Sequence, residues 1–176
     1  MERTLSRKQD SSVSSVPSVV TSACLKQAES PADVSRAREL FLEYAKSLNF
    51  SLCFQSFDKE LAELPGDYAP PDGRLLLLEQ SGNLAGCVGL HKLDADACEM
   101  KRLYLRSEFR GRGLGLVLAK AIIDEARQIG YRRMRLDTVE PVMKDAVAMY
   151  QKMGFKQIAP YRPNPIDGAM YMELEL

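Results

Sequence analysis

The stretch Arg110-Gly111-Arg112-Gly113-Leu114-Gly115 joins an apolar, strand-like run (residues 100–105) to an amphipathic helix. Its alternating glycines leave backbone N–H groups bare of side chains, and a helix N-terminus adds the positive end of its dipole. Such a junction attracts phosphate or pyrophosphate groups, and the two arginines add permanent charge. The sequence therefore predicts a site for an anionic ligand here. The alternative is that Gly113 and Gly115 only allow a tight turn and close packing of the helix.

Two familiar phosphate-binding loops do not fit this stretch. A P-loop requires a Gly-Lys-Ser/Thr sequence after its first glycine and four further residues, and no such sequence follows here. A dinucleotide-binding loop has the spacing Gly-x-Gly-x-x-Gly within an early βαβ unit, whereas the spacing here is Gly-x-Gly-x-Gly near the middle of the chain. The ligand class must therefore come from other features.

Length and charge limit the possible architectures and partners. The chain has 176 residues and a formal net charge of zero, which suits one domain with one core and does not favour nucleic acid or a membrane as partner. Residues 1–18 are rich in serine and lack periodicity, so we expect a flexible tail before a domain over residues 19–176. No apolar run reaches the roughly 20 residues of a membrane span, and no secretory signal is evident, so we expect a cytoplasmic protein.

The cysteines and the single histidine do not form a metal-binding pattern. Cys24, Cys53, Cys87 and Cys98 lack the spacing of metal sites and have mostly apolar neighbours, which predicts buried free thiols in a reducing compartment. We expect His91 to be structural or to lie at the edge of a substrate site. No metal is expected.

Hydrophobic periodicity predicts a mixed α/β (α+β) sheet on a single core. The expected strands are residues 19–27, 74–80, 84–90, 98–105, 132–138, 155–158 and 168–176, and the expected helices are residues 31–48, 57–64, 114–129 and 142–153. Ser81-Gly82-Asn83 predicts a hairpin between two of the strands. No internal repeat is visible.

This element order, with Arg110-x-x-Gly113-x-Gly115 followed by Tyr150-x-x-x-Gly154-Phe155, resembles the GNAT superfamily of acetyl-CoA-dependent N-acetyltransferases. The resemblance covers about residues 19–176. It implies a single-domain acyl-CoA N-acyltransferase fold, with a mostly antiparallel sheet of six to seven strands flanked by about four helices. It also implies acetyl-CoA as cosubstrate.

The resemblance assigns cosubstrate-binding roles to two segments. Backbone amides of Arg110, Gly111, Arg112, Gly113, Leu114 and Gly115 would hold the CoA pyrophosphate, and the backbone of Leu103 and Leu105 would pair with the pantetheine arm as a surrogate strand. One position departs from the family pattern: Met143 stands where many members have an asparagine that contacts the cosubstrate. Asp137 and Thr138 are possible substitutes for that contact, or they simply end their strand.

Acetyl transfer to an amine requires a neutral amine, a polarised carbonyl and a proton for the leaving thiolate. The resemblance implies that Tyr150 is the general acid, and a phenol with a pKa of about 10 does keep its proton at neutral pH. Glu99 resembles a base glutamate of the histone-acetylating branch, and it would need a raised pKa or a bridging water. The alternatives are that Tyr150 packs on the inner face of its helix and that Glu99 is an exposed strand residue paired with Lys101 or Arg102.

The segment before the last strand, Tyr161-Arg162-Pro163-Asn164-Pro165, often borders the acceptor pocket in this superfamily. Its prolines would hold Arg162 and Asn164 in place to bind a substrate carboxylate, unless the segment is only a rigid surface connector. Arg102 is a second candidate for an acidic substrate group.

These assignments predict direct acetyl transfer to the primary amine of a small molecule, which is amino-acid-like if it carries a carboxylate. The protein would be a monomer or a homodimer. A protein lysine or N-terminal acetyltransferase and a catalytically silent CoA-binding module are the alternatives.

Overall fold

The structure is a computed structural model that describes residues 23–176, except for the side chain of Phe54. The predicted tail (residues 1–18) and the first part of the predicted first strand (residues 19–22) lie outside the described residues. The strands are β1 (Ala23–Gln27), β2 (Arg74–Gln80), β3 (Asn83–Lys92), β4 (Ala97–Leu105), β5 (Arg133–Val139), β6 (Lys156–Ile158) and β7 (Ala169–Glu175). The α-helices are α1 (Pro31–Ser47), α2 (Phe57–Glu63), α3 (Leu114–Ile129) and α4 (Lys144–Lys152), and the short 3-10 helices are η1 (Cys53–Gln55), η2 (Gly66–Tyr68) and η3 (Ser107–Phe109).

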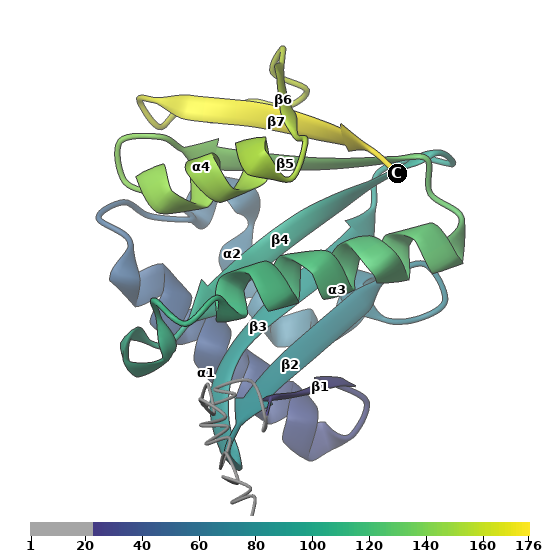
Figure 1. The fold of residues 1–176 in the computed structure, drawn as a ribbon, viewed down its shortest axis with the longest axis vertical. Helices are drawn as coiled ribbons and strands as arrows, with labels where there is room; N and C mark the ends of the chain where they lie inside the picture. The colour runs from purple at the N-terminus through teal and green to yellow at the C-terminus, as the bar shows by residue number, and fades with distance from the viewer. Residues whose placement is uncertain (1–22) are drawn as a thin grey trace, which may run out of the picture.

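The strands form one sheet in the order β1-β2-β3-β4-β5-β7-β6 (Figure 1). Neighbouring strands run antiparallel except β4 and β5, which are parallel. A mostly antiparallel sheet of seven strands with four α-helices confirms the predicted fold class. The parallel pair sits in the middle of the sheet, where it positions the site described below.

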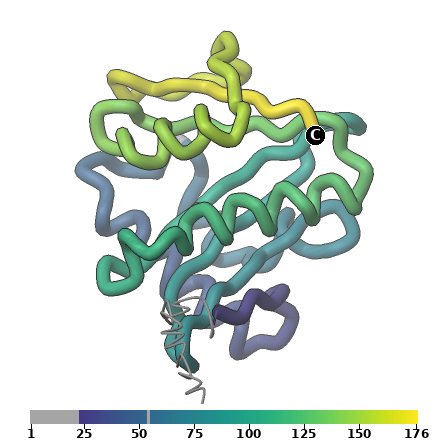
Figure 2. The backbone as a smooth tube through the Cα atoms, viewed as in Figure 1, coloured from purple at the N-terminus to yellow at the C-terminus, as the bar shows by residue number. Residues whose placement is uncertain are grey.

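The sheet separates two apolar layers, as the sequence of β2 requires. Successive side chains of a strand point to opposite faces, so Leu75 and Leu77 pack with α1 and α2, whereas Leu76 and Leu78 pack with α3. Figures 1 and 2 show α3 lying across β2, β3 and β4 on the face opposite α1. Both faces are thus covered, which explains why β2 is apolar along most of its length.

Local signals account for one end each of α1 and α3. The Ser30 side chain caps α1 by accepting a hydrogen bond of 3.1 Å from the Asp33 N–H. Helix α3 ends at Gly130, whose φ of 107° suits glycine. Helix α4 begins two residues later than predicted, because the N–H groups of Val142 and Met143 both donate to the Val139 carbonyl in a turn that precedes the helix.

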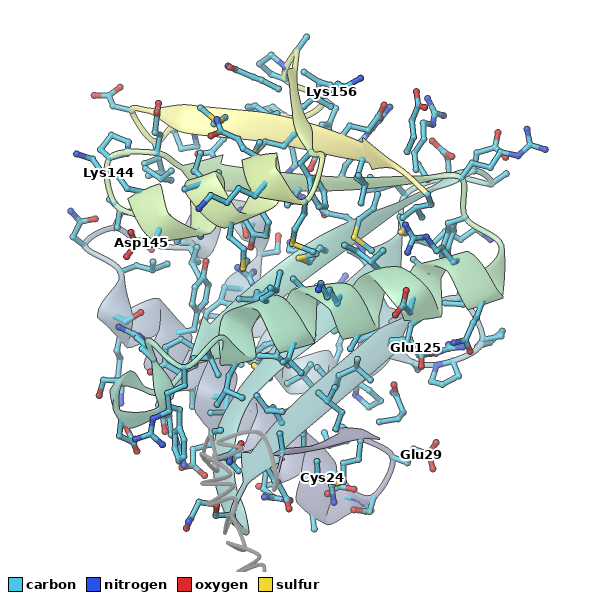
Figure 3. All side chains as sticks on the ribbon, in the orientation of Figure 1. Cys24, Glu29, Glu125, Lys144, Asp145 and Lys156 are labelled. Atoms are coloured by element: carbon cyan, nitrogen blue, oxygen red, sulfur yellow. The ribbon has the colours of Figure 1, made fainter. Side chains whose placement is uncertain are left out.

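The expectation for the cysteines is half right. All four cysteines are free, and Cys87 and Cys98 are buried, but Cys24 and Cys53 are exposed. Cys24 lies on β1, an edge strand with a solvent-facing side, at the margin of the molecule in Figure 3. Apolar neighbours in sequence do not bury a residue when its strand has a neighbour on one side only.

Candidate functional site

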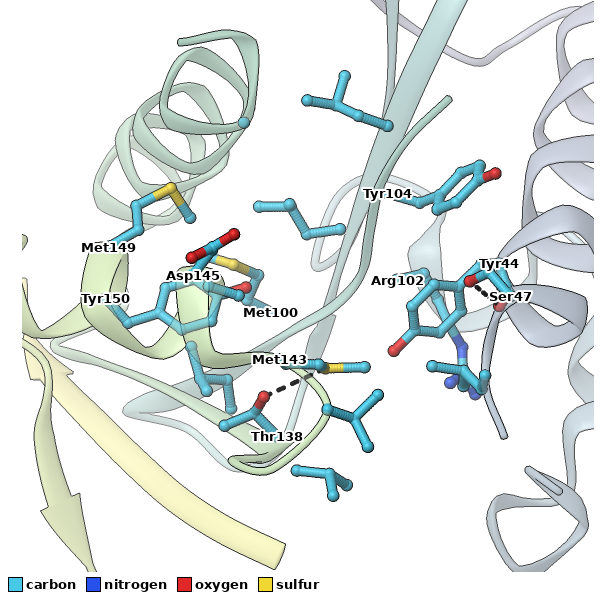
Figure 4. Close-up of a pocket in the computed structure, with 18 of the residues that line it drawn as sticks. Tyr44, Ser47, Met100, Arg102, Tyr104, Thr138, Met143, Asp145, Met149 and Tyr150 are labelled. Atoms are coloured by element: carbon cyan, nitrogen blue, oxygen red, sulfur yellow. Dashed lines mark hydrogen bonds between the residues drawn. The ribbon is translucent and has the colours of Figure 1, made fainter. Parts of the chain in front are cut away.

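A cavity of about 780 Å³ opens where β4 and β5 part. Figure 4 shows Tyr150, Met149 and Asp145 of α4 on one side of it. Tyr44, Ser47 and Arg102 lie on the opposite side. The cavity therefore joins elements from both faces of the sheet.

Strands β4 and β5 are paired only over residues 97–99 of β4, ending where Glu99 lies opposite Arg135. Beyond this point, residues 100–105 of β4 and 136–139 of β5 line the cavity instead of pairing with each other. An unpaired strand edge presents free N–H and C=O groups to which an extended ligand can add as a strand.

The glycine loop and the first turn of α3 form the second part of the site. Gly111 and Gly113 have φ values of 73° and 76°, and an added Cβ at either would meet nothing within 4 Å. Glycine is thus needed for the backbone conformation rather than for space. Gly113 precedes α3 without a side-chain cap, and the first helical bond runs from the Val117 N–H to the Gly113 carbonyl.

The first N–H groups of a helix have no carbonyl partner within that helix. At α3 these belong to Leu114, Gly115 and Leu116, which all line the cavity. Among the described residues no side chain caps them. This combination of free amides, left-handed glycines and a helix dipole fits the diphosphate of CoA.

Arg102 occupies a bulge in β4. The pairing with β3 shifts register here, and Arg102 has a φ of 56°. Its guanidinium donates to both Glu60 carboxylate oxygens, at 3.0 and 2.6 Å, and lies 5.1 Å from the centre of the Phe57 ring. Arg102 lines the cavity, but its charge is already paired.

Tyr150 lies on α4 with 7% of its surface exposed, and it lines the cavity. Its ring packs against Phe155, with ring centres 5.5 Å apart, so the Tyr150 and Gly154-Phe155 parts of the motif support each other. Burial raises the pKa of Tyr150 above its ordinary value. The phenol therefore keeps its proton at neutral pH.

Glu99 is fully buried at the base of the gap between β4 and β5. Its carboxylate lies 2.6 Å from His91 Nε2, accepts a 2.6 Å hydrogen bond from the Tyr161 hydroxyl, and pairs with Arg162 at 2.8 and 2.9 Å. Burial by itself would raise the Glu99 pKa, but the His91 hydrogen bond and the charges of Lys101 and Arg162 outweigh it and lower the pKa to about 2.

The network continues from Glu99 to β5. Arg162 also pairs with Asp137, and Asn164 Nδ2 donates to Asp137 Oδ2 at 3.0 Å. These bonds tie the segment before β7 to β4 and β5. Asp137 and Asn164 line the cavity, whereas Arg162 is not part of its lining.

At the N-terminus of α4, the Thr138 hydroxyl donates to the Met143 sulfur at 3.2 Å (Figure 4). Met143 precedes the helix and provides no side-chain cap. Lys144 and Asp145 follow at the same end of α4 (Figure 3).

Comparison with known proteins agrees with this geometry. The model of the acetyltransferase (GNAT) family matches residues 36–155. The chain belongs to the GNAT family. An uncharacterized N-acetyltransferase of Schizosaccharomyces pombe is 40% identical over 148 residues, which cover 83% of this chain and 90% of that protein.

Two solved structures share the GNAT fold. An acetyltransferase from Streptococcus agalactiae has a TM-score of 0.72 at 18% identity, covering 89% of this chain and 99% of that one. A GNAT family acetyltransferase from Elizabethkingia anophelis with acetyl-CoA bound has a TM-score of 0.60 at 20% identity, over 89% and 99% of the two chains. The protein is an acetyl-CoA-dependent acyltransferase of the N-acetyltransferase class.

The cavity of this GNAT enzyme brings together most of the predicted cosubstrate residues. Arg112 is the exception, because it is exposed and does not line the cavity. Arg110 lines the cavity and its Nε donates to the Leu105 carbonyl at 3.0 Å. The predicted residues that line the cavity are Leu103, Leu105, Arg110, Gly111, Gly113, Leu114 and Gly115.

The predicted catalytic and substrate residues are divided between the cavity and its support. Tyr150, Arg102 and Asn164 line the cavity, whereas Glu99 and Arg162 lie behind its wall. The alternative that Glu99 is an exposed strand residue paired with Lys101 or Arg102 is wrong, because it is buried and its ion pairs are with His91 and Arg162. This geometry argues against Glu99 as a direct base.

Tyr44 and Lys101 also line the cavity, and sequence reasoning gave neither a role in the site. Tyr44 reads as one of the apolar residues of α1, and nothing local marks it as a cavity residue. For Lys101 the sequence did contain an indication of a place near the site, because Lys101 lies two residues from Glu99 and therefore on the same face of β4.

Within residues 23–176, no cluster of His, Cys, Asp or Glu side chains could hold a metal ion. The helices described there include none that is both long and apolar enough to cross a membrane.

Proposed function

We propose that this GNAT enzyme transfers the acetyl group of acetyl-CoA directly to the primary amine of a small molecule within a ternary complex. The observation that carries the proposal is the single cavity that runs from the free amides of α3, along the unpaired edge of β4, to Tyr150 and on to Tyr44. A cavity of about 780 Å³ is within the usual range for small-molecule sites.

Three groups of the chain carry the proposed chemistry. The amides of residues 113–116 hold the diphosphate, and the edge of β4 aligns the pantetheine arm. As the amine nitrogen bonds to the acetyl carbon and the C–S bond breaks, Tyr150 gives its proton to the leaving thiolate. The amine loses one proton to water in the cavity, and this step replaces the direct role predicted for Glu99.

Glu99 and Arg162 are positioning residues in this proposal. Their ion pair holds the segment that carries Asn164 against β5, so that Asn164 and Asp137 form part of the acceptor wall. A carboxylate with a pKa of about 2 is a poor acceptor for a proton at neutral pH, which is why a supporting role fits Glu99 better.

The volume of the whole cavity favours a small amine over a peptide. The acceptor wall includes Leu48, Phe50 and Leu52, which lie between α1 and η1, and Gln55 of η1. The loop with Pro70 does not border this cavity but a smaller hollow between β1, β2 and α3, so it offers no channel wall for a polypeptide.

The test is an initial-rate assay that follows free thiol from acetyl-CoA with panels of small amines, lysine peptides and peptides with free N-termini. We expect turnover with small amines and intersecting double-reciprocal plots, which indicate a ternary complex. Turnover restricted to peptides would assign the protein-acetylating function instead. Parallel plots would contradict direct transfer, and tight CoA binding without turnover would indicate a binding module.

A further inference from the structure

The charged residues on the acceptor side of the cavity are nearly all paired with one another. Arg102 is held by both oxygens of Glu60. Arg162 is held by Glu99 and Asp137. The charges of the two arginines predicted to bind an acidic substrate group are therefore paired within the protein, although the buried Arg162 Nε has no hydrogen-bond partner among the described residues.

Lys101 is different. It lines the cavity and is half-buried, and it forms none of the ion pairs or side-chain hydrogen bonds found among residues 23–176. On β4 it lies next to Arg102 and two residues from Glu99, on the acceptor side of the cavity rather than at the glycine loop.

An unpaired ammonium in this position is unfavourable in the free enzyme. Burial and the Arg102 charge lower the Lys101 pKa, and the Glu99 and Glu60 carboxylates oppose this without reversing it. A ligand carboxylate at Nζ would give Lys101 the direct ion pair that it lacks among residues 23–176, and charge-assisted hydrogen bonds of this kind are the stronger ones.

We propose that Lys101 binds a carboxylate of the acceptor, so that the preferred substrates are small amines that also carry a carboxylate. This inference rests on the proposed function and names its substrate class. It moves the role predicted for Arg102 and Arg162 to a residue whose charge is free. A single lysine without a direct ion pair in the described part of the chain suits a single carboxylate of the ligand.

The experiment compares acceptors of the series H₂N-(CH₂)n-COOH, with n from 1 to 5, with the matching carboxamides at saturating acetyl-CoA. The quantity of interest is the ratio of kcat/KM for acid and amide, measured in the wild-type enzyme, Lys101→Met and Lys101→Arg. Dividing the wild-type ratio by the variant ratio cancels the difference in amine pKa between acid and amide. Lys92→Met is the matched control, because Lys92 lies on β3 outside the cavity and pairs with Asp72.

We expect the wild-type enzyme to prefer the acids and Lys101→Met to reduce the acid-to-amide ratio by about tenfold or more, mainly through KM. Lys101→Arg should keep a measurable part of the preference because it keeps the charge, and Lys92→Met should leave the ratio unchanged. Thermal melts of each variant check that it is folded.

Three outcomes would overturn the inference. An unchanged ratio in folded Lys101→Met would show that the carboxylate does not bind at Lys101. An equal fall in kcat for acids and amides, in both Lys101 variants, would make Lys101 a base instead. Equal use of acids and amides by the wild type would contradict the carboxylate-bearing substrate class but not the proposed acetyl transfer to small amines. No turnover of any small amine would contradict both.

Discussion

Glu99 of β4 and Arg135 of β5 are the last residues paired between the two strands. Beyond them β4 continues toward the glycine loop and β5 toward α4, so the cavity begins where the backbone pairing ends. Because Glu99 is also the centre of a buried ion network, the point of divergence is electrostatically fixed as well as hydrogen-bonded.

Replacing Gly113 by valine tests the amide cradle. With a φ of 76° the substitution should cost about 1–2 kcal/mol of stability, and the new side chain should cover the free amides and weaken CoA binding. Gly82→Val is the matched control, since Gly82 has a φ of 79° and equal free space but lies in the β2–β3 turn. Calorimetry should show weaker CoA binding only for Gly113→Val. Equal CoA affinity in both folded variants would refute the cradle.

Tyr150→Phe tests the general acid. The phenol makes no hydrogen bond to the described residues, so the variant should keep its stability and bind CoA nearly as well as the wild type. Its kcat should fall by about 10²–10⁴-fold, the usual contribution of a positioned acid. Tyr131→Phe, which loses a hydrogen bond to the Asp72 carbonyl away from the cavity, should keep its kcat. An unchanged kcat in Tyr150→Phe would remove Tyr150 from the chemistry.

The depressed pKa of Glu99 predicts a specific pH dependence of stability. A carboxyl whose pKa is about 2 when folded and about 4.5 when unfolded stabilises the folded protein above pH 4.5 and loses this contribution as the pH falls toward 2. Glu99→Gln should therefore be less stable than the wild type at pH 7, and the difference should shrink below pH 4.5. Urea titrations at several pH values measure this. A stability difference that grows in acid would contradict the assigned pKa direction.

The same Glu99→Gln variant separates a base from a positioning residue. If Glu99 only positions residues 160–168, the acid limb in the pH profile of kcat/KM should keep its pKa in the variant, and KM should rise. Loss of that limb would restore Glu99 as the base.

The Arg102–Glu60 pair predicts strong coupling. Glu60→Gln leaves the buried Arg102 guanidinium without its counter-charge and should cost about 3–5 kcal/mol of unfolding free energy. The double variant with Arg102→Met should be less destabilised than Glu60→Gln alone, because no unpaired charge remains. Urea unfolding of both singles and the double measures the coupling. If the changes in unfolding free energy of the two single variants add up to that of the double variant, Arg102 and Glu60 are not coupled. The ion pair would then not explain why Arg102 is buried.

Features that depend on neighbouring residues in the chain were predictable. The alternation in Leu75–Leu78, the length of α3 and the glycine loop all follow from local spacing, and all three appear in the structure. The role of Arg102 was not predictable, because its partner Glu60 lies 42 residues away and the bulge depends on the register with β3. The polar contacts of Glu99 were not predictable either, since His91, Tyr161 and Arg162 lie on other segments of the chain.

The crystal structure of the enzyme with CoA tests the central claim most directly. The account predicts diphosphate oxygens within hydrogen-bond distance of the amides of residues 113–116, the pantetheine arm along the free edge of β4, and the sulfur facing the Tyr150 hydroxyl. A diphosphate bound away from these amides, or a sulfur on the far side of β5 from Tyr150, would contradict it.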